Sequence, residues 1–446
     1  MDVRRIKKIP AKVFKYFENE NIPFWTYIAT FFSVIVIKQI LESMSQKDKV
    51  FDSASFVVEE NTFHFTLAYI AVVMALSIFI HFAASVSISK VCRVLLPGTI
   101  ILLSAPLIDL VSTLGAGVNI SYLQPGANVN LWRTYVTIGN GADGLSLGMR
   151  IEVTLLIFCF FYYFLTKNLP IYKSLVYAWL CYSVIFIWGM SPFIVTYILA
   201  SLGFSGVLTE ALMTKSFLFL LFFLVYWPAY LASPEVFLSI IRNLKISNII
   251  FSVLAVLFGA AVASASKNYD IHDFIYRDQE VTISFIFALM AVIYVMLFAM
   301  LIDLIAEAGK DKYSLNADAD SSTLKNLALI ILSLALFYAL FANAKAFLII
   351  ASMMSIIFIY YSKPFQIKRV PFLSGIALCS FALLAVFLGY VLIMKTSANF
   401  PLQLLWLYPV SMLATMKGGI SWRKIRGIVM PFCNAVLLAG IIYLFW

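Results

Sequence analysis

Long apolar runs separated by short polar stretches fill this chain from end to end. Many of the runs reach about 20 residues, the length that carries a helix across the hydrocarbon core of a bilayer. Backbone groups in lipid must pair within their own segment, so each run is expected to be a helix. The pattern predicts an all-α polytopic membrane protein with about 13–14 spans, at residues 24–43, 63–86, 96–114, 149–166, 173–189, 191–204, 216–232, 246–266, 281–304, 325–342, 346–361, 371–394, 402–416 and 427–446.

Loop charges test this count. With the N-terminus in the cytoplasm, the basic loop 87–93 falls on the cytoplasmic side, and the basic loops of the second half share one side with each other. Seven spans before Arg242 would put the basic segment 240–245 on the outer side of the membrane, where the positive-inside rule does not expect it. The run 191–204 has about 14 residues, which is short for a span. We therefore expect 191–204 to be re-entrant or merged with a neighbour.

The chain is expected to divide near residues 232–245, where polar and basic residues interrupt the apolar pattern. This gives an N-terminal multispan domain, residues 1–232, of unknown role, and a second domain, residues 233–446. The basic N-terminus, MDVRRIKKIPAKVFKYF, precedes an apolar run with no cleavage site after it. We expect that run to be a retained span, with the N-terminus on the cytoplasmic side.

Composition excludes a soluble protein. Hydrophobic residues make up 63% of the chain and charged residues 12%, whereas a soluble domain is nearer half apolar and a quarter charged. The net charge of +10 lies mostly in short loops, as the positive-inside rule predicts, and no nucleic-acid motif accompanies it. The five cysteines and three histidines form neither a disulfide framework nor a metal cluster.

One segment, LIDLIAEAGKDKYS (301–314), lines up three carboxylates at the end of an apolar run. Asp303, Glu307 and Asp311 stand four residues apart, on one helical face about 12 Å long. Like charges at this spacing cost roughly 0.2–0.5 kcal/mol per pair. A hard cation such as Mg²⁺, which prefers carboxylate oxygens, would offset that cost. Alternatively, the acids pair at the membrane surface with lysines, namely Lys310, Lys312 or Lys325.

A second segment, YYSKPFQIKR (360–369), ends a later span on the same expected side. Tyr361 supplies a phenol at the interface, and Lys363, Lys368 and Arg369 supply cations. An interfacial aromatic beside a basic loop is common in membrane proteins. Together with the carboxylates, however, these groups indicate metal-and-cation recognition of a diphosphate.

Acids also occur in the first half. Asp109 lies in an apolar span after Pro106. An intramembrane acid is a functional candidate by default, although pairing with a serine or tyrosine would give the same pattern. Glu152 and Glu210 lie near span ends and are expected at the interface.

The order of DLIAEAGKD, one helical hairpin, and YSKPFQIKR resembles the UbiA family of intramembrane prenyltransferases, over residues 235–446. That family carries an N-D-x-x-D-x-x-x-D motif and a Y-S-x-P-x-R-x-K-R motif. The resemblance implies that Asp303 occupies the position of the first Asn, Glu307 the middle Asp and Asp311 the last Asp. For the second motif it implies Tyr361, Lys368 and Arg369, with Gln366 in place of the usual Arg.

The resemblance implies a function as well as a fold. The three carboxylates would hold Mg²⁺, and Lys368 and Arg369 would hold a prenyl diphosphate. Tyr361 would position the substrate or stabilise its cationic carbon. The isoprenoid would pass to a hydrophobic lipid or aromatic acceptor within the bilayer.

Departures from the family pattern leave a second class of function open. The family's second Asp-rich motif would fall in 414–427, where this chain has no acid, and the half has seven expected helices rather than about nine. Cations there are expected to bind phosphate directly, or the missing acids come from Asp318 and Asp320 or from a membrane partner. A catalytically degenerate isoprenoid-lipid carrier or scaffold is the alternative; a transporter built on Asp109 would need an inverted repeat, which is not seen. The substitute cations are Lys417, Arg423, Lys424 and Arg426.

Overall fold

The computed structural model shows an all-α polytopic membrane protein. Its described residues carry eleven helices long and apolar enough to cross a bilayer, and the chain forms two compact units, Met1–Pro234 and Glu235–Trp446. The division falls at Pro234, inside the stretch where the sequence predicts a break. The described residues are 3–19, 21–45, 63–118, 130–140, 144–201, 210–242, 244, 246–267, 279–308, 321–362, 365–394 and 401.

Within the described residues, the candidate spans follow the hydropathy pattern closely. Eleven of the twelve expected spans that fall there are found. The exception is 191–204, where the helix runs only from Ser191 to Ser201 and is not a candidate span. The expected spans 402–416 and 427–446 lie outside the described residues. Which membrane face is cytoplasmic stays a prediction from the loop charges.

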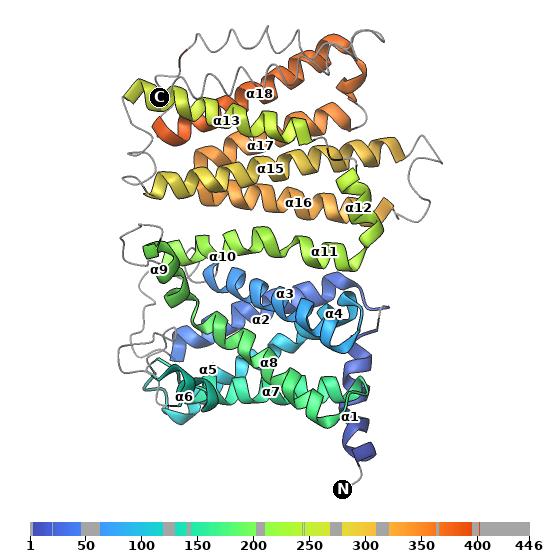
Figure 1. Ribbon diagram of the computed structural model, residues 1–446, viewed down its shortest axis with the longest axis vertical. Helices are drawn as coiled ribbons and strands as arrows, with labels where there is room; N and C mark the ends of the chain where they lie inside the picture. The colour runs from blue at the N-terminus through green and yellow to red at the C-terminus, as the bar shows by residue number, and fades with distance from the viewer. Residues whose placement is uncertain are drawn as a thin grey trace. The chain divides into compact units, whose positions relative to one another are not determined.

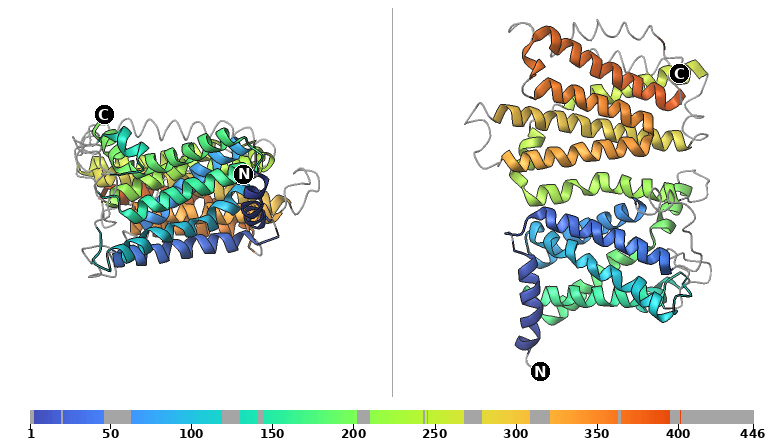
Figure 2. Two further views of the ribbon diagram at one scale, coloured as in Figure 1. Left: turned by 90° about the horizontal axis from the view of Figure 1, so that it is seen from below. Right: turned by 180° about the vertical axis from the view of Figure 1, so that it is seen from behind.

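The first unit packs its spans side by side (Figure 1). α1 crosses them at a steep angle, as Figures 1 and 2 show. Its Phe14 ring packs 5.2 Å from the Tyr163 ring, while Lys12 and Lys15 are exposed, the arrangement of an interfacial amphipathic helix. The elements are α1 (Val3–Phe17), α2 (Phe24–Ser45), α3 (Phe63–Ala84), α4 (Ile88–Gly98), η2 (Thr99–Leu103), α5 (Ser104–Ser112), α6 (Leu131–Val136), α7 (Leu147–Thr166), α8 (Ile171–Gly189), α9 (Ser191–Ser201), α10 (Glu210–Leu224) and α11 (Tyr226–Ala232).

The third span is interrupted in its middle. It runs from Ile88 to Ser112 as α4, the 3₁₀ segment η2 and α5, with Pro97 at the end of α4 because proline breaks the α-helical hydrogen-bond pattern. The segment 87–93, expected to be a basic loop, is therefore largely helical. Arg93 is buried there, and its Nη1 donates to the carbonyls of Asn19 and Ile22 at 3.1 and 2.6 Å. The Arg93 side chain therefore binds the turn between α1 and α2.

The second unit contains α12 (Pro234–Arg242), α13 (Ile246–Lys267), α15 (Gln279–Ala308), α16 (Ser321–Ala342), α17 (Ala344–Tyr361), η3 (Ile367–Arg369) and α18 (Pro371–Met394). α15 packs along α16, and α13 packs along α18. The second pair is held by two glycines: a Cβ on Gly259 would lie 1.9 Å from the Val386 carbonyl oxygen, and one on Gly389 would lie 1.9 Å from that of Val256. Small residues let membrane helices approach this closely.

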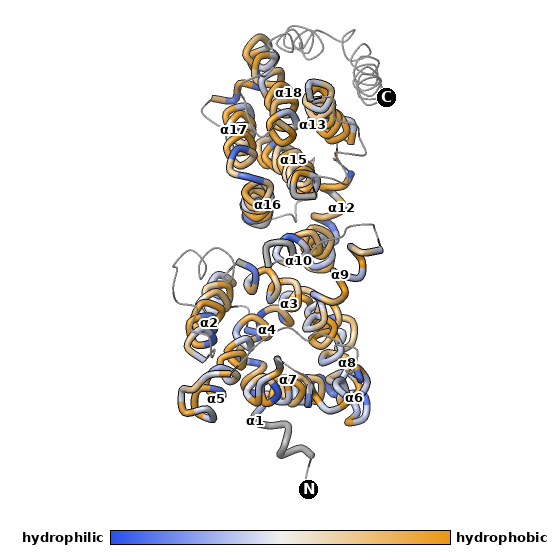
Figure 3. The backbone as a smooth tube through the Cα atoms, turned by 90° about the vertical axis from the view of Figure 1, so that its left-hand side faces the viewer, coloured by the Kyte–Doolittle hydropathy of each residue, from blue (hydrophilic) through white to orange (hydrophobic). Residues whose placement is uncertain are grey.

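Hydrophobic residues predominate along the spans of both units (Figure 3). Large apolar side chains such as Phe82 and Leu348 are 60% and 65% exposed. In a soluble protein such surface would drive aggregation. Here it faces lipid, which supports the membrane assignment.

Candidate functional site

The structure brings together three of the residues that the sequence predicts for one site. Asp303 lies near the end of α15, and Lys368 lies in η3, between α17 and α18. The Lys368 ammonium pairs with Asp303 Oδ1 and lies 5.1 Å from the centre of the Tyr361 ring. Asp303 and Lys368 are 65 residues apart in the chain, so the pair fixes the two motif segments against each other.

Local sequence explains how Lys368 reaches this position. The Ser362 N–H donates to the Phe358 carbonyl at 2.8 Å and ends α17. Gln366 then adopts a left-handed conformation, with φ of 38°, which few non-glycine residues adopt. This turn leads into η3, and α18 begins at Pro371, where the missing N–H costs nothing.

A side-chain contact holds the turn in place. The hydroxyls of Tyr360, on α17, and Ser374, on α18, lie 3.0 Å apart and share a hydrogen bond. Both residues are buried. Because η3 lies between them in the chain, this contact limits where Lys368 can be.

The burial of Asp303 makes its ion pair with Lys368 important for stability. Asp303 is 8% exposed and lies within a membrane span, where an unpaired carboxylate is strongly unfavourable. The Lys368 side chain is more open, at 29% exposed. Tyr361 is half-buried and Arg369 is exposed. The site thus joins a buried carboxylate to a partly exposed cation.

The remaining predicted residues are not placed. Glu307 lies in the last turn of α15, but its side chain is not described. Asp311, Arg423 and Lys424 lie outside the described residues, as does the whole 414–427 segment with its other cations.

The described residues do not fit a Mg²⁺ site. A hard cation takes about six oxygen ligands, usually with more than one from the protein. Among the residues that the structure covers, no group of three His, Cys, Asp or Glu side chains gathers to hold a metal. Asp303 supplies one carboxylate there, and a lysine already occupies one of its oxygens. Magnesium binding therefore stays a prediction that rests on Glu307 and Asp311.

Asp109, the intramembrane acid of the first unit, is paired. Ser146 donates its hydroxyl to Oδ2 at 2.5 Å, and the Gly148 N–H donates to Oδ1 at 2.8 Å. Ser146 also accepts from the Met149 N–H at 3.1 Å and caps α7. Asp109 thus joins α5 to the start of α7, which is the structural alternative that the sequence left open.

Sequence reasoning missed a buried ionic cluster nearby. Glu152, expected at the interface, is 8% exposed and buried in the first unit. Lys38 and Glu42 form a buried ion pair on α2. Their spacing of four residues inside an apolar run was the available signal, because an i,i+4 pair lets two charges share a membrane helix.

Gly148→Ala is expected to destabilise the first unit by about 1–3 kcal/mol, the usual cost of overpacking. A Cβ at this position would lie 2.1 Å from the Ala105 carbonyl oxygen. The rate at which a thiol reagent labels buried Cys181 on heating would measure the effect. Gly189→Ala is the matched control, since its Cβ would meet no atom within 4 Å. Equal labelling of the two variants would contradict the prediction.

No protein-family model, curated protein or solved structure matches this chain. The resemblance to the UbiA family therefore rests on the order of the two motif segments. Where they meet, the structure places Asp303, Lys368 and Tyr361 within one site.

Proposed function

We propose that the second unit binds a prenyl diphosphate and transfers its prenyl group to a hydrophobic lipid or aromatic acceptor in the bilayer. The observation that carries this proposal is the contact of Lys368 with both Asp303 and Tyr361. It joins a carboxylate, a cation and an aromatic face at the end of a membrane span. A diphosphate with an apolar tail needs a cation at the membrane boundary and lipid-like walls beyond it.

The charges of Lys368 and Arg369 are suited to the breaking of the C–O bond to the diphosphate. In the transfer, the C–O bond between the allylic carbon and the diphosphate breaks, and its electron pair stays on the diphosphate oxygen. Lys368 and the exposed Arg369 would stabilise the charge that develops there. The acceptor's nucleophilic atom then bonds to the allylic carbon, and the acceptor loses a proton.

Tyr361 has a distinct part in this scheme. Its ring already holds a cation, the Lys368 ammonium, 5.1 Å from its centre. Aromatic faces attract cations through the ring quadrupole. The same face would stabilise positive charge on the allylic carbon once Lys368 has moved toward the diphosphate.

A specific observation favours the second candidate function, isoprenoid binding without turnover. Asp303 and Lys368 neutralise each other in this structure. A diphosphate must compete with Asp303 for the lysine. An enzyme would have to break and re-form the Asp303–Lys368 pair in every catalytic cycle, whereas a protein that only binds the isoprenoid would not. Binding and turnover must therefore be measured separately.

The test uses the full chain in lipid nanodiscs with geranylgeranyl diphosphate, with Mg²⁺ or with EDTA. Under the proposal, the diphosphate binds, and pyrophosphate is released when hydrophobic acceptors are present. If Glu307 and Asp311 contribute to a metal site, binding weakens at least about tenfold in EDTA, since one bridging cation contributes several kcal/mol. Binding without pyrophosphate release from any acceptor would establish the carrier function instead. Absence of binding would contradict both.

A further inference from the structure

The first unit contains a cavity of about 950 Å³, at the upper end of the range for small-molecule sites. Arg150 and Tyr163 both line it and both lie on α7. Their separation of 13 residues corresponds to about 20 Å along the helix. This exceeds half of a hydrocarbon core of roughly 30 Å. The cavity is thus long enough for an aliphatic chain from one leaflet.

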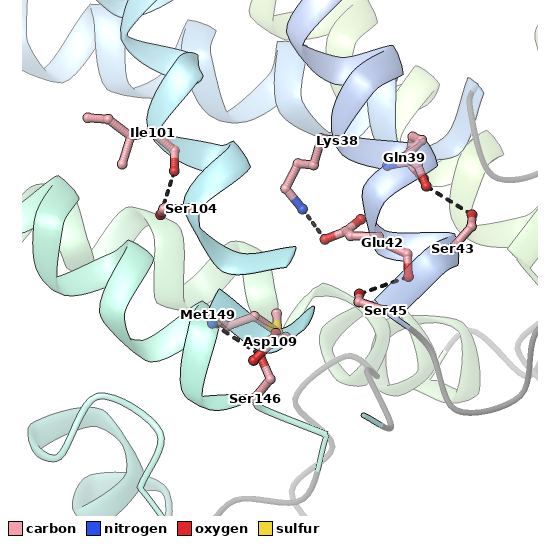
Figure 4. A network of polar contacts seen from close by, with 10 residues as sticks. All are labelled: Lys38, Gln39, Glu42, Ser43, Ser45, Ile101, Ser104, Asp109, Ser146 and Met149. Atoms are coloured by element: carbon pink, nitrogen blue, oxygen red, sulfur yellow. Dashed lines mark hydrogen bonds and ion pairs between the residues drawn. The ribbon is translucent and has the colours of Figure 1, made fainter. Parts of the chain in front are cut away.

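The lining is apolar along most of this length and ionic at one end. Phe14, Leu76 and Phe160 are among the apolar lining residues, whereas the charged lining residues are Lys38, Glu42, Arg150 and Glu152. Lys38, Glu42 and Glu152 are each less than 9% exposed. Figure 4 shows Lys38 and Glu42 on α2, and Asp109 with Ser146 where α5 meets the start of α7. An amphiphile has the same distribution of polarity.

Glu152 identifies the kind of head group. Its Oε2 has no accessible surface and no hydrogen-bond partner among the described residues. An ionised carboxylate oxygen is an acceptor only, and leaving it buried without a donor is costly. A ligand that places a donor at the ionic end of the cavity would remove this cost.

The surrounding charge favours a cationic donor. Lys38 acts electrostatically on Glu152, but so do the carboxylates of Glu42 and Asp109. Counting Arg150, which also lines the cavity, three acids share two cations at this end, and the Lys38 ammonium is already paired with Glu42. No ion pair joins Arg150 to Glu152 among the described residues. A further ammonium would balance the group.

We propose that the first unit binds a long-chain primary amine from the bilayer, with the aliphatic chain in the cavity and the ammonium donating to Glu152. The inference concerns the first unit alone. It stands whether or not the second unit transfers prenyl groups.

The test is native mass spectrometry of the full chain, mixed with equal amounts of hexadecylamine, hexadecanol and hexadecanoic acid. The expected result is one bound amine per chain, at least about tenfold preferred over the alcohol and the acid, because a charged hydrogen bond in a buried site is stronger than a neutral one. Equal binding of the three probes, tighter binding of the alcohol, or no binding would overturn the proposal. This comparison needs no variant.

Two substitutions locate the probe. Glu152→Gln, which keeps the side-chain shape, should remove the preference for the amine. Val153→Trp, at a half-buried cavity-lining position, should block the amine and the alcohol alike. Glu235→Gln is the matched control, because Glu235 is exposed and lies in the other unit. Labelling of Cys181 reports whether each variant is folded, and an amine preference that persists in folded Glu152→Gln would refute the assignment.

Discussion

Lys368→Ala is expected to weaken binding of geranylgeranyl diphosphate by about 10- to 100-fold and to lower any prenyl transfer by at least as much. A hydrogen bond to a charged group contributes about 1.5–3 kcal/mol, and each 1.4 kcal/mol corresponds to a factor of ten. Lys368 is the cation that the structure places against both Asp303 and Tyr361. Binding in nanodiscs and pyrophosphate release would measure the two effects.

Loss of fold must be separated from loss of function in this experiment. Lys368→Ala leaves the buried Asp303 carboxylate without its ammonium, which is destabilising by itself. Adding Asp303→Asn removes that charge, so the double variant should regain stability but not diphosphate binding. Lys345→Ala is the matched control: Lys345 is exposed in the first turn of α17, about 24 Å along the helix from Tyr361. If the double variant binds the diphosphate normally, Lys368 has only a structural role.

Gly259→Ala is expected to have the largest effect on folding, with about 3 kcal/mol, the upper end of the usual overpacking cost, lost from the stability of the second unit. The new Cβ would lie 1.9 Å from the Val386 carbonyl oxygen. That atom belongs to the backbone of α18, so it cannot turn away as a flexible side chain does, and the two helices must separate. Faster labelling of buried Cys379 on heating would show the loss.

The control for this substitution is Gly98→Ala, also in a helix, where a Cβ would meet no atom within 4 Å. Cys181 of the first unit gives an internal reference, because Gly259→Ala should leave its labelling unchanged. Unchanged labelling of Cys379 in Gly259→Ala would show that α13 and α18 are not held at this distance in the bilayer.

Hydropathy predicted the spans well, because burial of backbone groups in lipid leaves few alternatives to a helix. It also predicted that 191–204 is not an independent span. It failed at the segment 87–93, where a buried arginine that donates to the Asn19 and Ile22 carbonyls looks like a loop charge in sequence. Partners 71 and 74 residues away leave no mark on local composition.

The candidate site was predictable in part. The sequence identified Asp303, Tyr361 and Lys368 one at a time, and their placement on neighbouring spans made proximity reasonable. Their direct contact depends on the left-handed turn at Gln366 and on the bond between Tyr360 and Ser374, which no periodicity encodes. The roles of all three residues, and of Arg369, stay predictions. The cluster of Lys38, Glu42 and Glu152 was missed because averaging over a span dilutes single charges.

The glycine contact between α13 and α18 has a mechanical consequence for the ion pair. Gly259 of α13 and Gly389 of α18 each pack against a backbone carbonyl of the other helix. Sliding by one residue would drive a Cβ into a backbone oxygen, so the two helices must move as one rigid block. Lys368 lies three residues before the start of this block at Pro371, whereas Asp303 lies on α15, which packs along α16. The Asp303–Lys368 ion pair therefore connects two helix pairs. Any shift of one helix pair past the other must strain or break this ion pair.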